Sequence, residues 1–455
     1  MDPVLIHPDD SVVVDTETGH KIARRAIAKG ENVIKYGFPI GHATADIAPG
    51  ERVHTENLET NLRETGEYSY RHVKQLLNAR RAPTILAYER ANGEIGIRND
   101  VWIIPTVGCV NSAAEEIARR TGALAFTHPY GCSQLGGDHE TTRQILRGLI
   151  LHPNAGGVLV LGLGCENNQL PALREFLGKY DPDRIRFLIA QEVGDEIEAG
   201  VEIVRSLQGR TALDVPKLVP ASRLKIGLKC GGSDGFSGIT ANPLVGRFSD
   251  WLVAQGGTAV LTEVPEMFGA ETLLMNRCID RQVFDRCVQM INGFKDYYQR
   301  HGQVIYENPS PGNKAGGIST LEDKSLGCVQ KGGSAPVMDV LPYGARLKRH
   351  GLNLLTAPGN DMVSSTALAA AGCQMLLFTT GRGTPFGTVI PTVKIATNTL
   401  LATRKPHWID WDAMTQPNEL RLAERVIQIA SGDYLAQNEL RGNQDIAIFK
   451  DGVTL

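Results

Sequence analysis

Short apolar β-runs, each followed by a glycine-containing polar loop and a helical pattern, recur through most of this 455-residue chain. The run VWIIPTV precedes a helix expected from Ala113, and VLVLGLG precedes one expected from Pro171. Nearly all-apolar strands are typical of a parallel sheet that helices cover on both faces. Because ligands of such sheets bind beyond the carboxyl ends of the strands, function is expected in the loops that directly follow them.

A second series of the same units begins near Leu224 with LKIGLKCGG and continues through TAVLTEVPE, LNLLTAPGN and MLLFTTGRG. DIAIFKDGV is expected to be the last strand. A chain of this length exceeds what one hydrophobic core usually organises. We therefore expect an α/β body of two lobes with mainly parallel sheets, at residues 86–222 and 223–455.

The first 70 residues have a different pattern, with the short β-runs VLI, SVVV and NVIKYG separated by Gly and Pro turns. One short helix is expected around residues 22–28. This pattern predicts a small β-rich module at residues 1–70. The polar, charged stretch 63–81 indicates a linker or a surface helix, and the linker itself is placed at 71–85.

Charge and composition limit the kinds of partner that the protein is expected to bind. The formal net charge is −3 and the pI is about 6.4, which provides no basic field for nucleic acid or an anionic membrane. The N-terminus has no signal-peptide pattern, and no apolar run approaches the roughly 20 residues that cross a bilayer. A Walker loop is absent, and no GxGxxG follows the first strand. We expect a cytoplasmic protein that binds a small molecule.

Five of the eight cysteines lie in glycine-containing polar loops, and the first four of these directly follow β-runs. Close packing explains any one of them, but four at equivalent strand ends indicate a polar crevice. A helix N-terminus lowers a thiol's pKa, which suits a metal ligand or a nucleophile. No CxxC occurs, which argues against a structural zinc site. The five are Cys109, Cys132, Cys165, Cys230 and Cys328.

The β-rich module contains three turn-associated histidines, His20, His42 and His54, with Glu56 close to the last. They are candidate ligands for a metal shared with a neighbouring domain, although exposed turn histidines explain each one equally well. The GHK turn also places Lys21 beside His20 in a module too small to enclose a substrate alone. Both are expected to be exposed, so substituting either should hardly affect stability.

Several loops combine amides and cations that match a carboxylate and sugar hydroxyls, with glycine allowing close approach of the backbone. The candidates in these loops are Arg98, Asn99, Asn313, Lys314, Glu322, Lys324, Asn360, Asp361, Arg382 and Thr384.

Long stretches of the chain are similar to one known family, including GHKIA, YGCSQLGGDH, CGGSDGFSGITANPLVGRFSD, LTEVPEMFGAE and IYENPSPGNKAGGISTLEDKSLGC. From about residue 17 to the C-terminus, the chain resembles the altronate and galactarate dehydratase family. The resemblance implies an SAF-type β-clip domain at 1–70, followed by a catalytic α/β body. It also implies dehydration of D-altronate to 2-dehydro-3-deoxy-D-gluconate and water in galacturonate breakdown. Two departures are a shorter region before GHKIA, and Glu56 where a second histidine is usual.

The resemblance further implies a divalent metal, ferrous iron first and manganese second, with an iron–sulfur cluster on loop cysteines left open. A homodimer is expected. The pool of metal ligands is His20, His54, Glu56, Cys132, Cys165 and Glu166. Catalytic candidates are His20, Lys21, Lys314 and Glu322. Substrate-binding candidates are Lys35, Arg98, Asn99, Asn168, Asn313, Lys324, Asn360 and Arg382.

Four alternatives stay open at this point. Galactarate dehydratases and sulfolactate sulfo-lyases resemble the chain in domain plan but differ in substrate. A hydrolase would use Cys165 as nucleophile with His128 or His139 as base. A sugar-acid sensor without catalysis is disfavoured because no DNA-binding signature is present.

Overall fold

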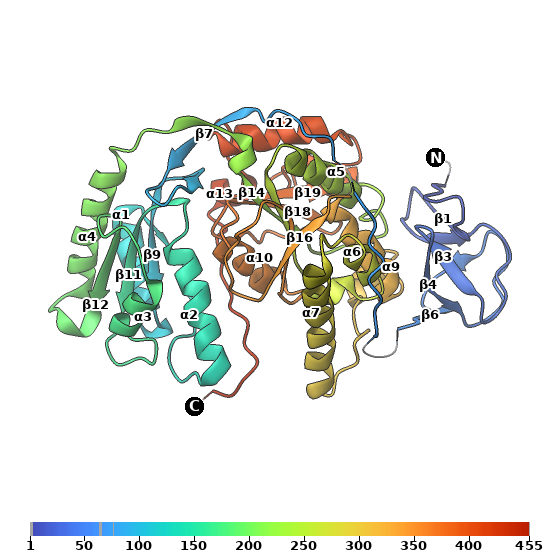
Figure 1. Cartoon of the computed structure of the whole chain (residues 1–455), viewed down its shortest axis with the longest axis horizontal. Coiled ribbons are helices and arrows are strands. Elements are labelled where there is room, and N and C mark those ends of the chain that lie inside the picture. The colour runs from blue at the N-terminus through green and yellow to red at the C-terminus, as the bar shows by residue number, and fades with distance from the viewer. Residues whose placement is uncertain (1–2, 63–65, 76, 455) are drawn as a thin grey trace.

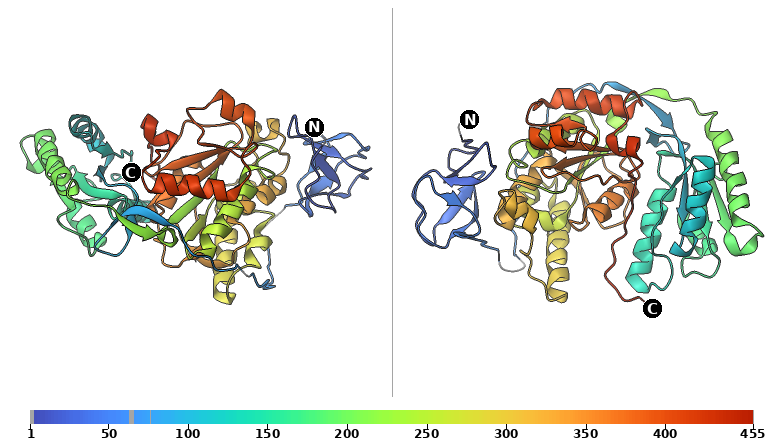
Figure 2. Two further views of the ribbon diagram at one scale, coloured as in Figure 1. Left: turned by 90° about the horizontal axis from the view of Figure 1, so that it is seen from above. Right: turned by 180° about the vertical axis from the view of Figure 1, so that it is seen from behind.

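The computed structural model describes residues 3–62, 66–75 and 77–454, which form three units in a row. Figures 1 and 2 show the N-terminal module at one end, a large lobe in the middle and a smaller lobe at the other end. None of the described helices is both long and apolar enough to cross a membrane.

The N-terminal module consists of two small antiparallel sheets. One has the order β1-β2-β5 (Val12–Val14, Lys21–Ala23, Arg52–Val53), and the other β3-β4-β6 (Asn32–Lys35, Phe38–Ala43, Leu58–Glu59). The helix expected at 22–28 was wrong. The start of that stretch is strand β2, and Ala23 and Ile27 point into the module's core. Tertiary pairing therefore overrides local helix propensity here.

The segment after the module is an extended linker, and no helix occurs in its described residues 66–75 and 77–83. It runs along the middle lobe, where Tyr68 donates to Glu271 and Tyr70 donates to the carbonyl of Cys278. The Val73 amide donates to the carbonyl of Asn276 at 2.8 Å. Of the two alternatives, linker and surface helix, the described residues show the linker.

The first lobe is built on a parallel sheet of order β10-β9-β11-β12 (Leu124–Ala125, Asp100–Pro105, Ala155–Gly162, Ile185–Ile189). The alternating side chains of β9 and β11 enter two different cores, as a strand with both faces buried requires. One core contains α1 (Asn111–Thr121) and α4 (Glu196–Thr211), and the other α2 (Gly136–Ile150) and α3 (Leu170–Leu177).

A three-stranded antiparallel sheet, β13-β7-β8 (Lys217–Pro220, Thr84–Glu89, Ile95–Gly96), lies where the two lobes meet.

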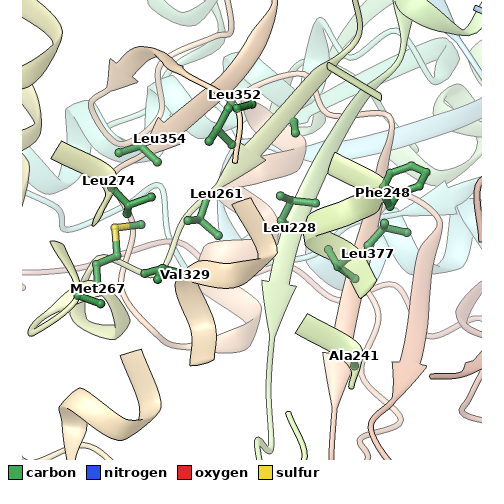
Figure 3. Close-up of a cluster of buried hydrophobic side chains, with 14 of the residues drawn as sticks. Leu228, Ala241, Phe248, Leu261, Met267, Leu274, Val329, Leu352, Leu354 and Leu377 are labelled. Atoms are coloured by element: carbon green, nitrogen blue, oxygen red, sulfur yellow. The ribbon is translucent and has the colours of Figure 1, made fainter. Parts of the chain in front are cut away.

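The second lobe contains seven parallel strands in the order β16-β17-β15-β14-β18-β19-β20. They span Val337–Leu341, Gly351–Leu355, Thr258–Leu261, Lys225–Cys230, Met375–Thr380, Thr392–Ala396 and Trp411–Asp412. Figure 3 shows Leu228 and Leu261 of the central strands packed in the core with Phe248 of α5 (Ala241–Ala254). The expectation of an α/β body with mainly parallel sheets is confirmed.

The helices around this sheet include α7 (Arg281–Arg300), α10 (Asp361–Ala370) and α12 (Glu419–Ala430). Shorter helices are α6 (Glu271–Met275), α8 (Pro311–Ala315), α9 (Leu321–Cys328), α11 (Thr399–Arg404) and α13 (Gln437–Arg441). Of these, α8 and α9 contact the N-terminal module, which is called the β-clip from here on.

The final run DIAIFKDGV is not a strand, so that expectation was wrong. It is an irregular segment between the two lobes that buries Ile446 and Ile448. The amides of Asp451 and Gly452 both donate to the Asp138 carboxylate of the first lobe. Its alternating apolar residues pack between the two lobes and do not pair with a sheet.

Candidate active site at the carboxyl edge of the second lobe

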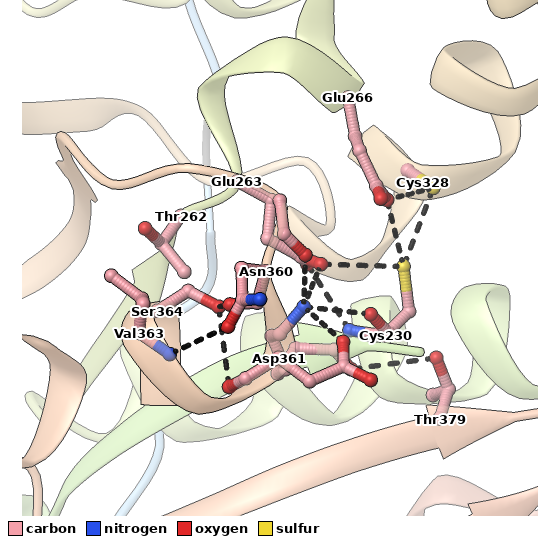
Figure 4. A network of polar contacts seen from close by, with 12 residues as sticks. Cys230, Thr262, Glu263, Glu266, Cys328, Asn360, Asp361, Val363, Ser364 and Thr379 are labelled. Atoms are coloured by element: carbon pink, nitrogen blue, oxygen red, sulfur yellow. Dashed lines mark hydrogen bonds and ion pairs between the residues drawn. The ribbon is translucent and has the colours of Figure 1, made fainter. Parts of the chain in front are cut away.

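Two cysteines and a glutamate meet at the carboxyl ends of the central strands. Cys230 is the last residue of β14, Cys328 is the last residue of α9, and Glu266 lies in the short helix η4 (Val264–Met267) after β15. The Sγ atoms of Cys230 and Cys328 are 3.4 Å apart, and Glu266 Oε2 lies 3.3 and 3.1 Å from them. Figure 4 shows the three side chains converging.

All three side chains are buried, and their ligand atoms lie within 4.8 Å of one another. Thiolates and a carboxylate are donors for first-row transition metals. This group could therefore hold a metal ion.

Three lysines surround the sulfur atoms. Lys331 Nζ lies 2.8 Å from Cys230 Sγ and 3.0 Å from Glu263 Oε2. Lys324 Nζ pairs with Glu266 Oε1 at 2.8 Å. Lys229 pairs with Glu263 and, at 2.9 Å, with Asp361. Three ammonium groups thus face three carboxylates, which balances the buried charge.

The pKa values reflect this balance. Burial alone would raise the pKa of Glu266, but Lys324, Lys229 and Lys331 outweigh it and lower that pKa to about 2. The hydrogen bond with Cys230, together with burial, raises the pKa of the Cys328 thiol well above its usual range. Exchanging two thiol protons for one divalent cation would keep the buried charge balanced.

A cavity of about 560 Å³ opens beside this group. Lys324, Asn313 and Asn360 line it together with Cys230 and Glu266. The glycine-rich loop after β14 has no room for a side chain at Gly231, because a Cβ there would lie 2.5 Å from the Asp361 carboxylate. The size and the convergent polar groups fit a small polar ligand.

A larger cavity of about 840 Å³ lies in the first lobe and contains none of these residues. Its arginines already have partners, since Arg90 donates to the carbonyl of Pro153 and Arg184 to Asp214. These two arginines are therefore engaged within the protein itself.

The opposite side of α9 contacts the β-clip. Asp323 accepts from Lys21 at 2.7 Å and from Lys35 at 2.9 Å, and Lys21 also donates to the carbonyl of Gly317. Burial raises the pKa of Asp323, but the two lysines outweigh it and hold that pKa well below its usual range. Burial lowers the pKa of Lys21 to about 8.

The exposure expected for Lys21 was therefore wrong, because its side chain is fully buried. Asp323 and Lys324 are neighbours on α9, yet one faces the β-clip and the other the cavity.

The β-clip histidines also lie at this interface. The rings of His20 and His54 are 5.3 Å apart, and His54 Nε2 lies 2.7 Å from the carbonyl of Lys314. Glu56 is 3.8 Å from His54 Nδ1. Burial lowers the pKa of both histidines, and His20 Nδ1 is buried without a hydrogen-bond partner among the described residues. Glu322 accepts from Thr60 and from the Asn61 amide.

The predicted metal ligands are divided between two places. His20, His54 and Glu56 meet in the β-clip, whereas Cys132, Cys165 and Glu166 lie at the carboxyl edge of the first lobe. Glu166 is engaged there, accepting from Thr106 at 2.7 Å and from the Gly164 amide.

The predicted substrate-binding residues are also divided. Asn313, Lys324 and Asn360 line the cavity, and Arg382 lies nearby, donating to the carbonyl of Gly312. Lys35 is locked in the β-clip interface. The others are engaged elsewhere: Arg98 pairs with Glu439, Asn99 donates to the carbonyl of Thr211, and Asn168 donates to that of Thr106.

The arrangement required for a cysteine hydrolase is absent from the described residues, where no hydrogen bond joins Cys165 to His128 or His139. His128 Nε2 donates to the carbonyl of Pro105, and its Nδ1 accepts from the Tyr130 amide. Burial lowers the pKa of His128 to about 4. Its two nitrogens are thus already used, and it cannot act as the base for Cys165.

The sequence analysis did not select Glu263, Glu266 or Lys331, and among the loop cysteines it named Cys132 and Cys165 as metal ligands, not Cys230 and Cys328. One signal was present: TEVPE places two carboxylates directly after the apolar run TAVL, at the end of a predicted parallel strand.

A parallel-sheet lobe with buried thiols, a carboxylate and a polar cavity at its carboxyl edge, covered by a small β-module, has the architecture of a multidomain α/β enzyme. Three family models match the chain in order: "Altronate/galactarate dehydratase SAF domain" at 6–61, "D-galactarate dehydratase/Altronate hydrolase, second domain" at 87–212, and "D-galactarate/Altronate dehydratase, C-terminal" at 221–454. The chain belongs to the altronate and galactarate dehydratase family.

Curated relatives cover nearly the whole chain. It is 55% identical to the altronate dehydratases of Bacillus subtilis (strain 168) and Escherichia coli (strain K12), over 97% of this chain and 93% of each relative. It is 32% identical to the galactarate dehydratase (L-threo-forming) of Escherichia coli (strain K12), over 86% of this chain and 79% of that protein.

Proposed function

We propose that this chain dehydrates D-altronate to 2-dehydro-3-deoxy-D-gluconate. The relatives that support this are the two altronate dehydratases, which match it over nearly their full length. The structural observation that carries the proposal is the buried group of Cys230, Glu266 and Cys328 beside a polar cavity. Loss of water next to a carboxylate requires both a place for developing negative charge and groups that move protons.

Cys230, Glu266 and Cys328 would hold one divalent metal ion, ferrous iron in preference to manganese. The donor set fits such an ion, because two soft sulfurs and one oxygen already lie within 4.8 Å of one another. When bound, the metal supplies a Lewis acid that stabilises the charge formed as the proton leaves C2.

Lys324 is proposed to bind the substrate carboxylate. Its Nζ contacts Glu266 and lies 3.0 Å from Asn308 Oδ1 and 3.3 Å from Asn313 Oδ1, at the wall of the cavity. Although burial lowers the pKa of Lys324, Glu266 outweighs burial and raises that pKa, so the ammonium stays charged. A substrate carboxylate would replace one of the two amide oxygens as an acceptor of the Lys324 ammonium, because a charge-assisted hydrogen bond is stronger than one to a neutral amide.

His20, which lies at the β-clip interface and not among the residues that line the cavity, is proposed to accept or return a proton once the bound substrate reaches this interface. Its imidazole is neutral at pH 7 because burial lowers its pKa, and its Nδ1 has no partner among the described residues. Lys21 and Glu322 are positioning residues in this scheme, since both are held in the interface between the β-clip and α9. Lys314 positions His54 in this scheme, because its backbone carbonyl accepts a hydrogen bond from His54 Nε2.

The test is turnover of three acids by anaerobically prepared, iron-loaded protein. D-altronate should give a product positive in the colour reaction for 2-keto-3-deoxy acids, at a kcat/KM above those for galactarate and sulfolactate. Turnover of galactarate or sulfolactate alone would replace the proposed substrate. Lys324→Met should reduce turnover strongly, while Lys179→Met, at the first-lobe cavity, should not.

A reducing, cytoplasmic setting suits the eight free cysteines, three of which are exposed. The expected homodimer stays a prediction, which light scattering on the full chain would test.

A further inference from the structure

Three exposed cysteines lie in neighbouring loops at the carboxyl edge of the first lobe, outside the site proposed above. Cys109 follows β9, Cys132 follows β10 and Cys165 follows β11, and all three are free thiols. The sheet order β10-β9-β11 makes their loops neighbours. Adjacent strands are about 4.8 Å apart, so three neighbouring loops span a distance that one polyatomic ligand can bridge.

Hydrogen bonds tie these loops into one surface. The Gly108 amide donates to the carbonyl of Tyr130 at 2.9 Å, and the Asn168 amide donates to that of Gly131 at 3.0 Å. The approach is so close that a Cβ at Gly131, which has φ +100°, would lie 1.9 Å from the carbonyl oxygen of Thr106. The three loops that carry the cysteines are therefore packed directly against one another.

Each loop also contains a half-satisfied amide. Asn111 donates to the carbonyl of His128, Gln134 accepts from the Gly131 amide, and Asn168 donates to the carbonyl of Thr106. The other polar atom of each amide is buried and has no hydrogen-bond partner among the described residues. Leaving such an atom unpaired costs about 1–3 kcal/mol, and three of them beside three thiols point to a polar ligand.

The arrangement does not suit a single metal ion. Among the described residues, only Cys230, Glu266 and Cys328 bring three such ligand atoms within 4.8 Å. The three exposed thiols therefore do not form so compact a group, whereas thiolates on one zinc lie about 3.8 Å apart, given metal–sulfur bonds of about 2.3 Å. In an iron–sulfur cluster each thiolate binds a different iron, so the thiolates can lie farther apart than on a single ion.

An iron–sulfur cluster with its thiolate ligands is anionic, and the nearby helix N-termini favour such a ligand. Helices α1, α2 and α3 begin within a few residues of Cys109, Cys132 and Cys165, respectively. The positive ends of their dipoles stabilise thiolates and other negative charge close to them.

We propose that Cys109, Cys132 and Cys165 hold a four-iron, four-sulfur cluster. Three protein thiolates bind three of the irons, and the fourth iron is open to an oxygen ligand such as water or a carboxylate. This site is separate from the metal ion proposed at Cys230, Glu266 and Cys328.

The experiment is anaerobic reconstitution of the full chain with ferric iron, sulfide and an excess of a thiol that reduces part of the iron to the ferrous state, followed by desalting. The wild type should show broad visible absorption and about four iron and four acid-labile sulfide per chain beyond the single ion of the second lobe. Cys109→Ala, Cys132→Ala and Cys165→Ala should each lose most of the sulfide and the absorption. These positions are exposed, so the melting temperature before reconstitution should not change.

Cys230→Ser is the matched control, because it alters the second-lobe group and should keep the full sulfide content. Iron bound without labile sulfide in the wild type would overturn the proposal. Sulfide that survives all three alanine substitutions would also overturn it. Neither result would affect the test of D-altronate turnover, so the two proposals fail separately.

Discussion

The two parallel sheets both carry cysteines at their carboxyl edges, but in opposite surroundings. In the first lobe, Cys132 and Cys165 are exposed, and no lysine in the described part of the chain contacts them. In the second lobe, Cys230 and Cys328 are buried, and Lys331 and Glu266 contact sulfur directly. The same strand–loop–helix plan thus produces two kinds of thiol site. Burial and countercharge, and not the loop sequence alone, decide which chemistry each one supports.

Removing a thiol from the buried edge should have the largest effect on activity. Cys328→Ser should lower kcat/KM for D-altronate about a thousandfold, equivalent to roughly 4 kcal/mol of transition-state stabilisation, because the metal loses a ligand. Metal analysis should show the corresponding loss of the bound ion. Cys278→Ser, also buried but outside the site, is the control and should keep its metal. Near-wild-type turnover by Cys328→Ser would remove the buried edge from catalysis.

Neutralising one buried carboxylate in each lobe should lower the free energy of unfolding by different amounts. Asp323→Asn leaves Lys21 and Lys35 buried without a carboxylate, which should destabilise the docked β-clip by about 3–5 kcal/mol. Glu166→Gln, at the first-lobe edge, loses hydrogen bonds but strands no cation, and should cost only about 1–3 kcal/mol.

The measurement is the rate of trypsin cleavage in the linker together with denaturant unfolding. Faster release of the β-clip in Asp323→Asn than in Glu166→Gln is expected. Equal rates would show that the ionic network does not hold the β-clip.

Acid should weaken the first lobe before the second. Burial lowers the pKa of His128 to about 4 and that of His152 to about 3, whereas an unfolded histidine titrates near 6.5. The unfolded state therefore binds more protons below about pH 6.5, and stability is lost as the pH falls from 6.5 towards 4. Glu266, with a pKa lowered to about 2, contributes stability that is lost only below about pH 4.5.

Hydrogen exchange followed by mass spectrometry would resolve the two windows. First-lobe peptides should lose protection near pH 5, while those of the second lobe keep theirs. His152→Gln, which cannot titrate, should reduce the difference. Simultaneous loss in both lobes would contradict the assignment.

Thiol labelling tests the smallest of these effects. It should distinguish the exposed cysteines of the first lobe from the buried cysteines. In metal-free, reduced protein, iodoacetamide should modify Cys109, Cys132 and Cys165 within minutes and leave the five buried cysteines unmodified until unfolding. Peptide mapping would read the pattern. Rapid labelling of Cys230 or Cys328 would mean that their surroundings open readily.

The sequence predicts most of the fold because a strand buried on both faces is largely apolar, as β11 is along its whole length. It failed at residues 22–28 and at the C-terminal run, where distant segments decide the conformation: Ala23 hydrogen-bonds to Glu51, and Ile446 packs between the lobes. Local pattern does not encode such partners.

The loop cysteines could also be predicted, but the choice among them could not. The buried group depends on Lys331, which lies 101 residues after Cys230, and the burial of Lys21 depends on Asp323, 302 residues away. No spacing rule links residues so far apart. Of the three β-clip histidines that the sequence groups, His20 and His54 lie side by side, whereas His42 contacts Asn61. The contact of His54 with Lys314 of α8 appears only in the folded chain.

Cobalt titration of the metal-free chain tests the central claim most directly, because thiolate coordination to cobalt(II) produces an intense charge-transfer absorption that reports the sulfur ligands themselves. We predict one equivalent of cobalt bound with this absorption in the wild type and in Cys132→Ala, and no such absorption in Cys328→Ser. Retention of the band in Cys328→Ser, or its loss only in Cys132→Ala, would contradict the assignment of the metal to Cys230, Glu266 and Cys328.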